Sequence, residues 1–193
     1  MTEVAAPAGS KRRRAVFVDR DGTLNPDLHY LSDPARVEVF RGVAEGIRLL
    51  RDHGYLVVCV TNQSGIERGF YNDADVRAIH GRITAILAAE GAAVDRFYYC
   101  PHAPESHCRC RKPGVELFER ARSELGVAFA GSAIVGDRTL DIEAGEKLGL
   151  LTALVPPPGH AAEVAEEVRR SGVRPDFVAP SFRAAAMRIL HRG

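Results

Sequence analysis

The chain has 193 residues, of which 46% are hydrophobic and 26% are charged, a composition typical of a soluble globular domain with one substantial core. Its 26 Lys and Arg balance 25 Asp and Glu, so overall charge provides no attraction to nucleic acid or to an anionic membrane, and neither partner is expected. No apolar run approaches the roughly 20 residues that span a bilayer, and no signal-type segment follows the start, so we expect a cytoplasmic protein.

The first 14 residues, MTEVAAPAGSKRRR, are rich in Ala, Pro and Gly and end in a basic run. A basic run can bind nucleic acid, but at the end of such a tail it is more typical of a solvated arm. We therefore expect residues 1–14 to form a flexible arm. Residues 15–193 are expected to form a single domain, and the protein is expected to be a monomer.

From residue 15 onward, apolar runs alternate with segments of helical period. We expect strands at 15–19, 55–62, 96–100, 132–137 and 150–155, and helices at 42–54, 73–90, 115–125 and 139–148. A helix at 161–170, a short extended segment at 176–179 and a last helix from Phe182 follow. Repeated βα units with uniformly apolar strands predict an α/β, Rossmann-like fold, in which a mainly parallel sheet is covered by helices on both faces. The irregular stretch 22–39 is too short for a separate lid domain and is expected to form a flap.

Polar side chains follow the predicted strands where each strand ends. In parallel sheets these ends meet at one edge, where ligands bind. The groups expected to converge there are Asp19, Asp21, Thr61, Lys112, Asp137 and Asp141. Two carboxylates at the end of an apolar strand repel each other unless a cation meets them, and carboxylate oxygens suit Mg²⁺. We therefore expect a magnesium site.

The order DxDGT, TN, K and GDxxxD resembles the haloacid-dehalogenase-like (HAD-like) superfamily of aspartate-nucleophile phosphatases, from residue 15 to about residue 155. The resemblance implies that Asp19 attacks phosphorus and forms an aspartyl-phosphate. It implies that Asp21 protonates the leaving oxygen and later deprotonates the hydrolytic water. Thr61 and Lys112 would hold the phosphoryl oxygens. An Asp two residues after the nucleophile, rather than the Thr of phosphate-retaining relatives, indicates prompt hydrolysis.

The same resemblance implies that Mg²⁺ is bound by Asp19, the backbone carbonyl of Asp21 and Asp137. Asp141 would contact the Mg²⁺ through a water molecule or would hold one of these ligands in place. An acidic residue in the first turn of a helix is also favoured by the helix dipole, so for Asp141 a purely structural role stays open. The resemblance also implies a capless member of the superfamily, that is, one without a separate cap domain over the site.

A second constellation lies in the segment CPHAPESHCRCRKP, whose residues 100–112 we call the Cys/His loop. Cys100, His102, Cys108 and Cys110 supply four ligands of the kind that closes a tetrahedral Zn²⁺ site, so the zinc would be structural. A disulfide is the alternative, disfavoured by a reducing cytosol. His107 is the alternative to His102. Cys59 is interpreted as a small core residue.

Within the superfamily, the segments DRDGTLN, TNQSGIERGFY and YYCPHAPESHCRCRKP are similar to the heptose 1,7-bisphosphate 7-phosphatases. That similarity implies removal of the 7-phosphate from a phosphosugar during synthesis of nucleotide-activated heptose, with the anomer undetermined. The flap and the Cys/His loop would shape the pocket. Residues that match the family's substrate site are Asn62, Gln63, Ser64, Arg68 and Arg111, and arginines suit a second phosphate.

Two departures from the family bear on selectivity. Glu67 stands where many relatives have Ala, which is expected to place a carboxylate beside the pocket. The Cys/His loop is short, as in the histidinol-phosphate phosphatases. After the second strand, however, those enzymes have a sequence similar to TNQDG, whereas this chain has TNQSG. Heptose is therefore favoured over histidinol phosphate, which stays the alternative. A nucleic-acid 3′-phosphatase and a binding module without catalysis are less consistent with the charge balance and the intact motifs.

Overall fold

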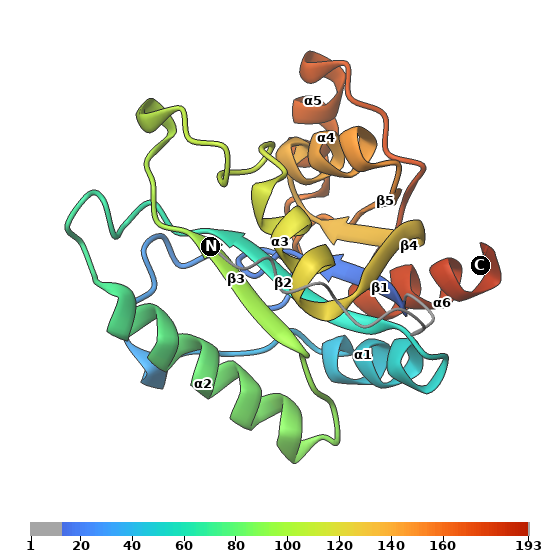
Figure 1. The fold of residues 1–193 in the computed structure, drawn as a ribbon, viewed down its shortest axis with the longest axis horizontal. Helices are drawn as coiled ribbons and strands as arrows, with labels where there is room; N and C mark the ends of the chain where they lie inside the picture. The colour runs from blue at the N-terminus through green and yellow to red at the C-terminus, as the bar shows by residue number, and fades with distance from the viewer. Residues whose placement is uncertain (1–12, 193) are drawn as a thin grey trace, which may run out of the picture.

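The fold is built on one parallel sheet of six strands in the order β3-β2-β1-β4-β5-β6, within residues 13–192, which the computed structural model describes. The strands are β1 (Arg13–Val18), β2 (Leu56–Asn62), β3 (Arg96–Cys100), β4 (Val127–Gly136), β5 (Leu151–Leu154) and β6 (Phe177–Val178). The helices are α1 (Val43–Asp52), α2 (Asp73–Ala89), α3 (Glu116–Leu125), α4 (Thr139–Leu148), α5 (Ala161–Ser171) and α6 (Phe182–Arg192). Two 3-10 turns complete the described chain, η1 (Pro34–Arg36) and η2 (Pro104–Ser106). The predicted parallel α/β architecture is confirmed (Figure 1).

Alternate residues of the central strand β1 point to opposite faces of the sheet, as the period of a strand requires. Val16 and Val18 belong to the core beneath α1, α2 and α6. Ala15 and Phe17 belong to the core beneath α3 and α4, where the ring of Phe17 meets that of Phe118 edge-on with centroids 5.0 Å apart. Both faces of β1 are therefore covered, which explains why its sequence is apolar without alternation.

The first strand and its neighbour β4 are both longer than the sequence predicts. Arg13 and Arg14 pair with Val127 and Ala128, and an irregularity in register precedes the pair Val16 and Ala133. Arg13 and Arg14 therefore belong to β1 and not to an arm, which corrects the expected boundary at residue 15. The rest of the predicted arm, residues 1–12 with Lys11 and Arg12, lies outside the described residues.

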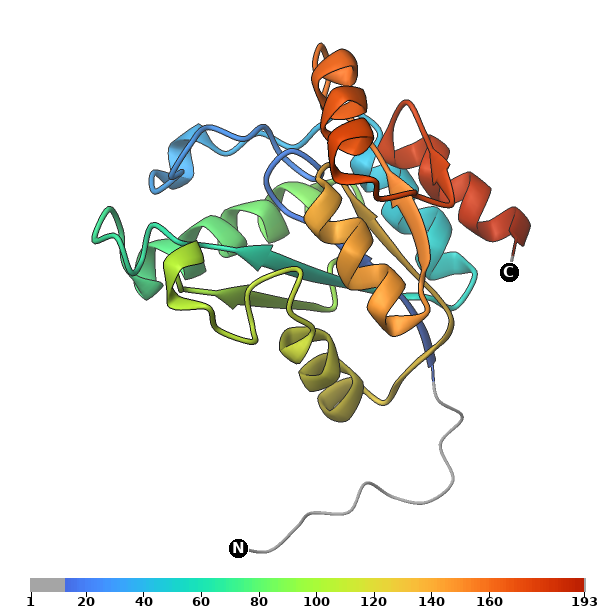
Figure 2. The same cartoon turned by 90° about the horizontal axis from the view of Figure 1, so that it is seen from above.

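The segments that follow the first three strands extend from the same edge of the sheet. Figure 2 shows the connections after β1 (blue), after β2 (teal) and after β3 (yellow-green) on one side of the molecule. We keep the name flap for residues 22–39 and call residues 63–72 the β2 loop. Within the described chain, the flap holds a single 3-10 turn and no inserted domain. None of the helices among residues 13–192 has the length and apolar character that a membrane crossing needs.

Helix α4 lies so close to the sheet that Gly145 has no room for a side chain. A Cβ at this position would lie 2.5 Å from Ile134 Cγ2 and 2.7 Å from Thr152 Cγ2. Gly81, in the middle of α2, is different, because a Cβ there would meet nothing within 4 Å.

These two glycines predict opposite effects of the same substitution. Gly145→Ala should lower the free energy of unfolding by about 1–3 kcal/mol, because the added methyl overpacks the helix–sheet contact. Gly81→Ala should raise it by about 0.5–1 kcal/mol, because alanine favours the helix. Urea unfolding of both variants measures the difference, and equal effects would contradict the close packing of α4.

Candidate active site

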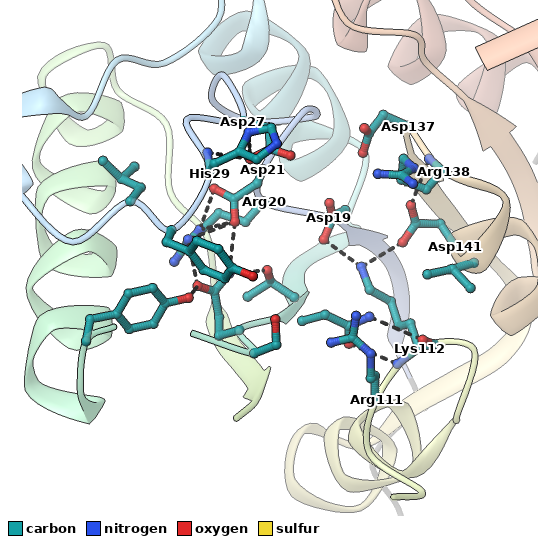
Figure 3. A pocket seen from close by; sticks show the side chains of 18 residues that line it. Asp19, Arg20, Asp21, Asp27, His29, Arg111, Lys112, Asp137, Arg138 and Asp141 are labelled. Atoms are coloured by element: carbon teal, nitrogen blue, oxygen red, sulfur yellow. Dashed lines mark hydrogen bonds and ion pairs between the residues drawn. The ribbon is translucent and has the colours of Figure 1, made fainter. Parts of the chain in front are cut away.

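A pocket of about 250 Å³ opens at the edge of the sheet from which the loops extend. Four strand ends contribute to its wall, as the parallel topology predicts. From the end of β1 to the start of α4, the lining includes Asp19, Arg20, Asp21, Thr61, Asn62, Gln63, Ser64, Arg111, Lys112, Asp137, Arg138 and Asp141 (Figure 3). All six groups expected to converge at the strand ends therefore share one cavity.

The Lys112 ammonium group lies at the centre of the site. Its Nζ is 2.6 Å from Asp19 Oδ1 and 2.6 Å from Asp141 Oδ1, and it donates to the carbonyl of Val60 at 2.7 Å. Burial alone would lower the pKa of Lys112, but Asp141 and Asp19 outweigh it and raise the pKa. The side chain amide of Asn62 pairs with the backbone N–H and carbonyl of Lys112 at 2.9 and 3.2 Å. Asn62, expected to bind substrate, thus fixes the backbone that carries the lysine.

Three buried carboxylates crowd the side of the pocket nearest β4. Oxygens of Asp19, Asp137 and Asp141 lie within 4.8 Å of one another. Burial, together with Asp19 and Asp141, raises the pKa of Asp137 to about 9. Burial also raises the pKa of Asp19 to about 6, against the opposing effect of Lys112. Such a cluster of hard oxygen ligands fits a divalent cation of the magnesium type.

The turn after β1 approaches this cluster so closely that only glycine fits. Gly22 has a φ of +88°, and a Cβ there would lie 2.3 Å from Asp137 Oδ2. The Gly of the DxDGT motif is therefore required both by the backbone conformation and by the carboxylate next to it.

Asp21 is held by a different cation from the one that holds Asp19. Its carboxylate accepts from Arg20 Nη2 at 2.8 Å, from Asn25 Nδ2 at 2.9 Å and from Gln63 Nε2 at 2.9 Å. Burial would raise the pKa of Asp21, but the Arg20 guanidinium outweighs it and lowers the pKa. Two aspartates two residues apart are thus placed in opposite electrostatic environments.

Arg20 lines the pocket and is not among the residues predicted from the sequence. It is 1% exposed and is among the largest fully buried side chains of the described chain. A signal was present, because Arg20 continues the alternation of Val16 and Val18 and so points to the same buried face. A guanidinium on that face requires a carboxylate partner, which Asp21 supplies.

A hydrogen-bonded network stands behind Arg20. Its Nη2 donates to Gln63 Oε1 at 2.9 Å, and the hydroxyl of Tyr71 donates to the same oxygen at 2.7 Å. Gln63 Nε2 also donates to Thr61 Oγ1 at 2.8 Å. Gln63, expected to bind substrate, therefore orients Thr61 and Asp21. On the far side, His80 Nε2 lies 3.4 Å from Arg20 Nη1.

The outer part of the pocket carries two arginines. Arg111, from the Cys/His loop, donates through Nη1 to the carbonyl of His102 at 3.2 Å. Arg138, after β4, was not anticipated; its Nε pairs with Glu167 of α5 at 3.1 Å. Both arginines line the cavity, as does Ser64.

The flap closes another side of the pocket. Asp27, His29 and Tyr30 line the cavity, and Tyr30 packs on Phe70 of the β2 loop with ring centroids 4.5 Å apart. His29 and Tyr30 have positive φ values of 46° and 57°, a conformation that is uncommon outside glycine and asparagine and that often marks functional loops. The expectation of a short flap without a lid domain agrees with this arrangement.

Two predicted residues do not reach the pocket. Arg68 is exposed and pairs with Glu105 of the Cys/His loop at 3.4 Å, so the structure does not place it at the cavity wall. Glu67 was expected beside the pocket, but its carboxylate accepts a hydrogen bond from Ser106. Both side chains point to the Cys/His loop because the β2 loop runs along it.

The Cys/His loop brings its four predicted ligands together. Cys110 Sγ lies 3.1 Å from Cys100 Sγ, 3.2 Å from His102 Nδ1 and 3.5 Å from Cys108 Sγ. Ligand atoms around a tetrahedral zinc are about 3.5 to 3.8 Å apart, so the four groups are gathered closely enough to hold this metal after small shifts. His102 and not His107 belongs to the cluster found among the described residues. Cys59, by contrast, is fully buried in the main core, as predicted.

Comparison with known proteins gives a consistent group of relatives. The HAD-hydrolase-like family model matches residues 109–185. A D-glycero-beta-D-manno-heptose-1,7-bisphosphate 7-phosphatase from Haemophilus ducreyi is 38% identical over 156 residues, which cover 77% of this chain and 86% of that protein. A D-glycero-alpha-D-manno-heptose-1,7-bisphosphate 7-phosphatase from Photorhabdus laumondii is 31% identical over 154 residues, which cover 76% of this chain and 84% of that protein.

The fold comparison points the same way. The crystal structure of D,D-heptose 1,7-bisphosphate phosphatase from B. bronchiseptica, complexed with magnesium and phosphate, matches with a TM-score of 0.82 and 30% sequence identity. The match covers 93% of this chain and 99% of that chain. The extent of this match shows that the two chains share one overall fold.

His80 predicts a pH dependence of stability. Burial, and then the Arg20 guanidinium, lower the pKa of His80 from 6.5 to about 3. Between these values the unfolded chain binds a proton that the folded chain excludes, so the contribution of His80 is complete above pH 6.5 and is lost as the pH falls. The loss is about 1.4 kcal/mol per pH unit.

Urea unfolding between about pH 7 and about pH 5 checks this prediction. The free energy of unfolding should fall less for His80→Asn than for the unsubstituted protein. His191→Asn, at an exposed position of α6, is the control and should follow the unsubstituted protein. An identical pH slope in H80N would contradict the prediction.

Proposed function

Because the chain belongs to the HAD-like hydrolases, in the family of the D-glycero-D-manno-heptose-1,7-bisphosphate 7-phosphatases, it is a phosphoric monoester hydrolase, and we propose that it removes the 7-phosphate from a heptose 1,7-bisphosphate. The observation that supports this best is the Lys112 ammonium 2.6 Å from both Asp19 and Asp141. The ammonium group places a positive charge beside the Asp19 carboxylate, where it can stabilise the negative charge of a phosphoryl group that approaches Asp19.

In the proposed first step, a carboxylate oxygen of Asp19 attacks phosphorus and the bond from phosphorus to the sugar oxygen breaks. Asp21 gives a proton to that oxygen, and the Thr61 hydroxyl and Lys112 ammonium hold the phosphoryl oxygens. In the second step, Asp21 takes a proton from water, the water oxygen attacks the aspartyl-phosphate, and inorganic phosphate leaves. The acid and base roles of Asp21 thus alternate within one turnover.

The surroundings of Asp21 support its role as a base directly. Arg20 keeps its carboxylate ionised, which is the form that accepts a proton from water. A bound phosphate brings negative charge next to Asp21 and so raises its pKa, which favours the protonated form needed in the first step. Gln63 and Asn25 keep the carboxylate in position in both states.

The metal that we propose is Mg²⁺, held by Asp19, the backbone carbonyl of Asp21 and Asp137. It would supply positive charge to the phosphoryl oxygens. Asp141 acts through Lys112, whose ammonium it shares with Asp19. The four ligands of the Cys/His loop leave zinc no open position, so its proposed role is to fix the loop that carries Arg111 and Lys112.

The substrate proposal rests on the two arginines of the outer pocket. A heptose bisphosphate carries a second phosphate away from the one that is cleaved, and Arg111 and Arg138 line the cavity at its outer part. One guanidinium group can donate hydrogen bonds to two oxygens of the same phosphate, so either arginine can hold the phosphate that is not cleaved. We place the reaction in the synthesis of nucleotide-activated heptose, carried out by a cytoplasmic monomer that needs no nucleic-acid partner.

A phosphate-release assay tests the substrate. The enzyme with Mg²⁺ should release one phosphate from heptose 1,7-bisphosphate, offered as separate α and β anomers because relatives are named for each. The kcat/KM for the better anomer should exceed that for histidinol phosphate by about 100-fold or more, because the arginines have no second phosphate to bind in the latter. Omission of Mg²⁺ from the zinc-loaded enzyme should abolish turnover, and its addition should restore it. A higher kcat/KM for histidinol phosphate would refute the proposal.

Substitution of Asp21 tests the mechanism. Asp21→Asn should lower kcat by about 10²- to 10⁴-fold, because proton transfer is lost in both steps while the phosphate-binding groups stay in place. Steady-state kinetics measures the effect, and circular dichroism confirms folding. Asp52→Asn, at an exposed position of α1, is the matched control and should be fully active. Full activity of D21N would show that another group moves the proton.

A further inference from the structure

Glu67 makes contacts whose purpose the phosphatase chemistry does not explain. The residue lies in the β2 loop and is exposed. The hydroxyl of Ser106 lies 2.7 and 2.6 Å from its two carboxylate oxygens, and the backbone N–H of Ala103 donates to Oε2. The backbone N–H of Glu67 itself donates to the carbonyl of Pro101 at 3.2 Å. One residue of the β2 loop is therefore bonded to three positions of the Cys/His loop.

Neighbouring contacts extend this connection along both loops. Arg68 pairs with Glu105 at 3.4 Å, and the backbone N–H of Gln63 donates to the carbonyl of Cys100 at 2.7 Å. The β2 loop is thus attached at its start through Gln63 and at its middle through Glu67. The Glu67 contacts hold the first half of the Cys/His loop, from Pro101 to Ser106.

The positions that Glu67 holds flank a predicted zinc ligand. His102 stands between Pro101 and Ala103, and its ring nitrogen Nδ1 lies 3.2 Å from Cys110 Sγ. The carbonyl of the same residue accepts from Arg111 Nη1 at 3.2 Å. The backbone around His102 therefore carries the ligand cluster on one side and an arginine of the pocket on the other.

We propose that Glu67 is a positioning residue that couples the stability of the zinc cluster to substrate binding. By fixing Ala103 and Ser106 it holds His102 in ligand position and, through the His102 carbonyl, holds Arg111 over the pocket. The part that concerns substrate rests on the proposed function and deepens it, since it assigns the geometry of Arg111 to a residue outside the pocket.

The burial of Ala103 explains why this contact matters although Glu67 is exposed. Exposed ion pairs contribute little because water replaces the lost partner. Ala103 is only 8% exposed, so water replaces the glutamate poorly as the acceptor for its N–H, and an unsatisfied buried donor is unfavourable. The loop is therefore expected to shift when Glu67 is removed.

Three variants of the full-length, zinc-loaded protein test the proposal. Glu67→Ala removes both acceptor oxygens, and Glu67→Gln keeps one oxygen for the Ala103 N–H. Glu146→Ala, at an exposed position of α4, changes the net charge by the same amount away from the loops. Two quantities are measured: the rate at which zinc passes to a chromogenic chelator, and kcat and KM for heptose 1,7-bisphosphate.

E67A should release zinc about three- to tenfold faster and raise KM by a similar factor, with kcat changed less than about twofold. E67Q should fall between E67A and the unsubstituted protein, because one hydrogen bond is kept, and E146A should match the unsubstituted protein. Unchanged zinc release and KM in E67A would overturn the proposal. A change in only one of the two quantities would overturn the coupling, and a fall in kcat alone would place Glu67 in the chemistry instead.

Zinc release involves no substrate, so the two proposals fail separately. A chain that does not hydrolyse the bisphosphate refutes the proposed function, and the role of Glu67 is then decided by zinc release alone. In that case, faster zinc release in E67A and a release rate closer to that of the unsubstituted protein in E67Q support the positioning role of Glu67. Equal release in all three variants refutes it.

Discussion

The site depends on one constraint, which is that three buried carboxylates lie within 4.8 Å of one another beside a single ammonium group that contacts two of them. Lys112 arrives from the loop after β3, whereas Asp19 follows β1 and Asp137 and Asp141 follow β4. Only a parallel sheet with β1 between β2 and β4 brings these strand ends together. With all three carboxylates ionised, two negative charges stay uncompensated, which is the charge that the proposed magnesium ion would neutralise. The fold therefore brings one compensating charge, Lys112, to the carboxylates, and the proposed metal would supply the rest.

A second buried cation separates the roles of two aspartates that are neighbours in sequence. Asp19 faces Lys112 and the other carboxylates, and its pKa is raised to about 6. Asp21 faces Arg20, and its pKa is lowered. Strand alternation alone would place Asp19 and Asp21 on the same side, but the chain leaves the strand after Val18 and turns, and Asp21 pairs with Arg20 whereas Asp19 pairs with Lys112. Different environments are what allow one carboxylate to be proposed as a nucleophile and the other as an acid and base.

The sequence was sufficient for the architecture and for the six groups that meet at the strand ends, but not for Arg20 and Arg138, which also line the pocket. Apolar runs of strand length placed the sheet, and parallel strands placed Asp19, Thr61, Lys112 and Asp137 at one edge. Directions of side chains in loops follow no period, so Arg68 and Glu67 were expected at the pocket although they contact the Cys/His loop. Likewise, the partners that occupy the amides of Asn62 and Gln63 become visible only when distant segments are placed together.

The position of each strand in the sheet has a consequence for how this family can diverge. Asp19, the proposed nucleophile, follows β1, which is paired on both sides, whereas the Cys/His loop follows β3 at the edge of the sheet as described here. Lengthening the part of that loop that precedes Lys112 leaves the ladder between β2, β1 and β4 intact, provided that Lys112 keeps its place beside Asp19. Selectivity can therefore change through insertions in a peripheral segment, while the proposed phosphate chemistry keeps Asp19 beside an inner strand and Lys112 at the end of the loop.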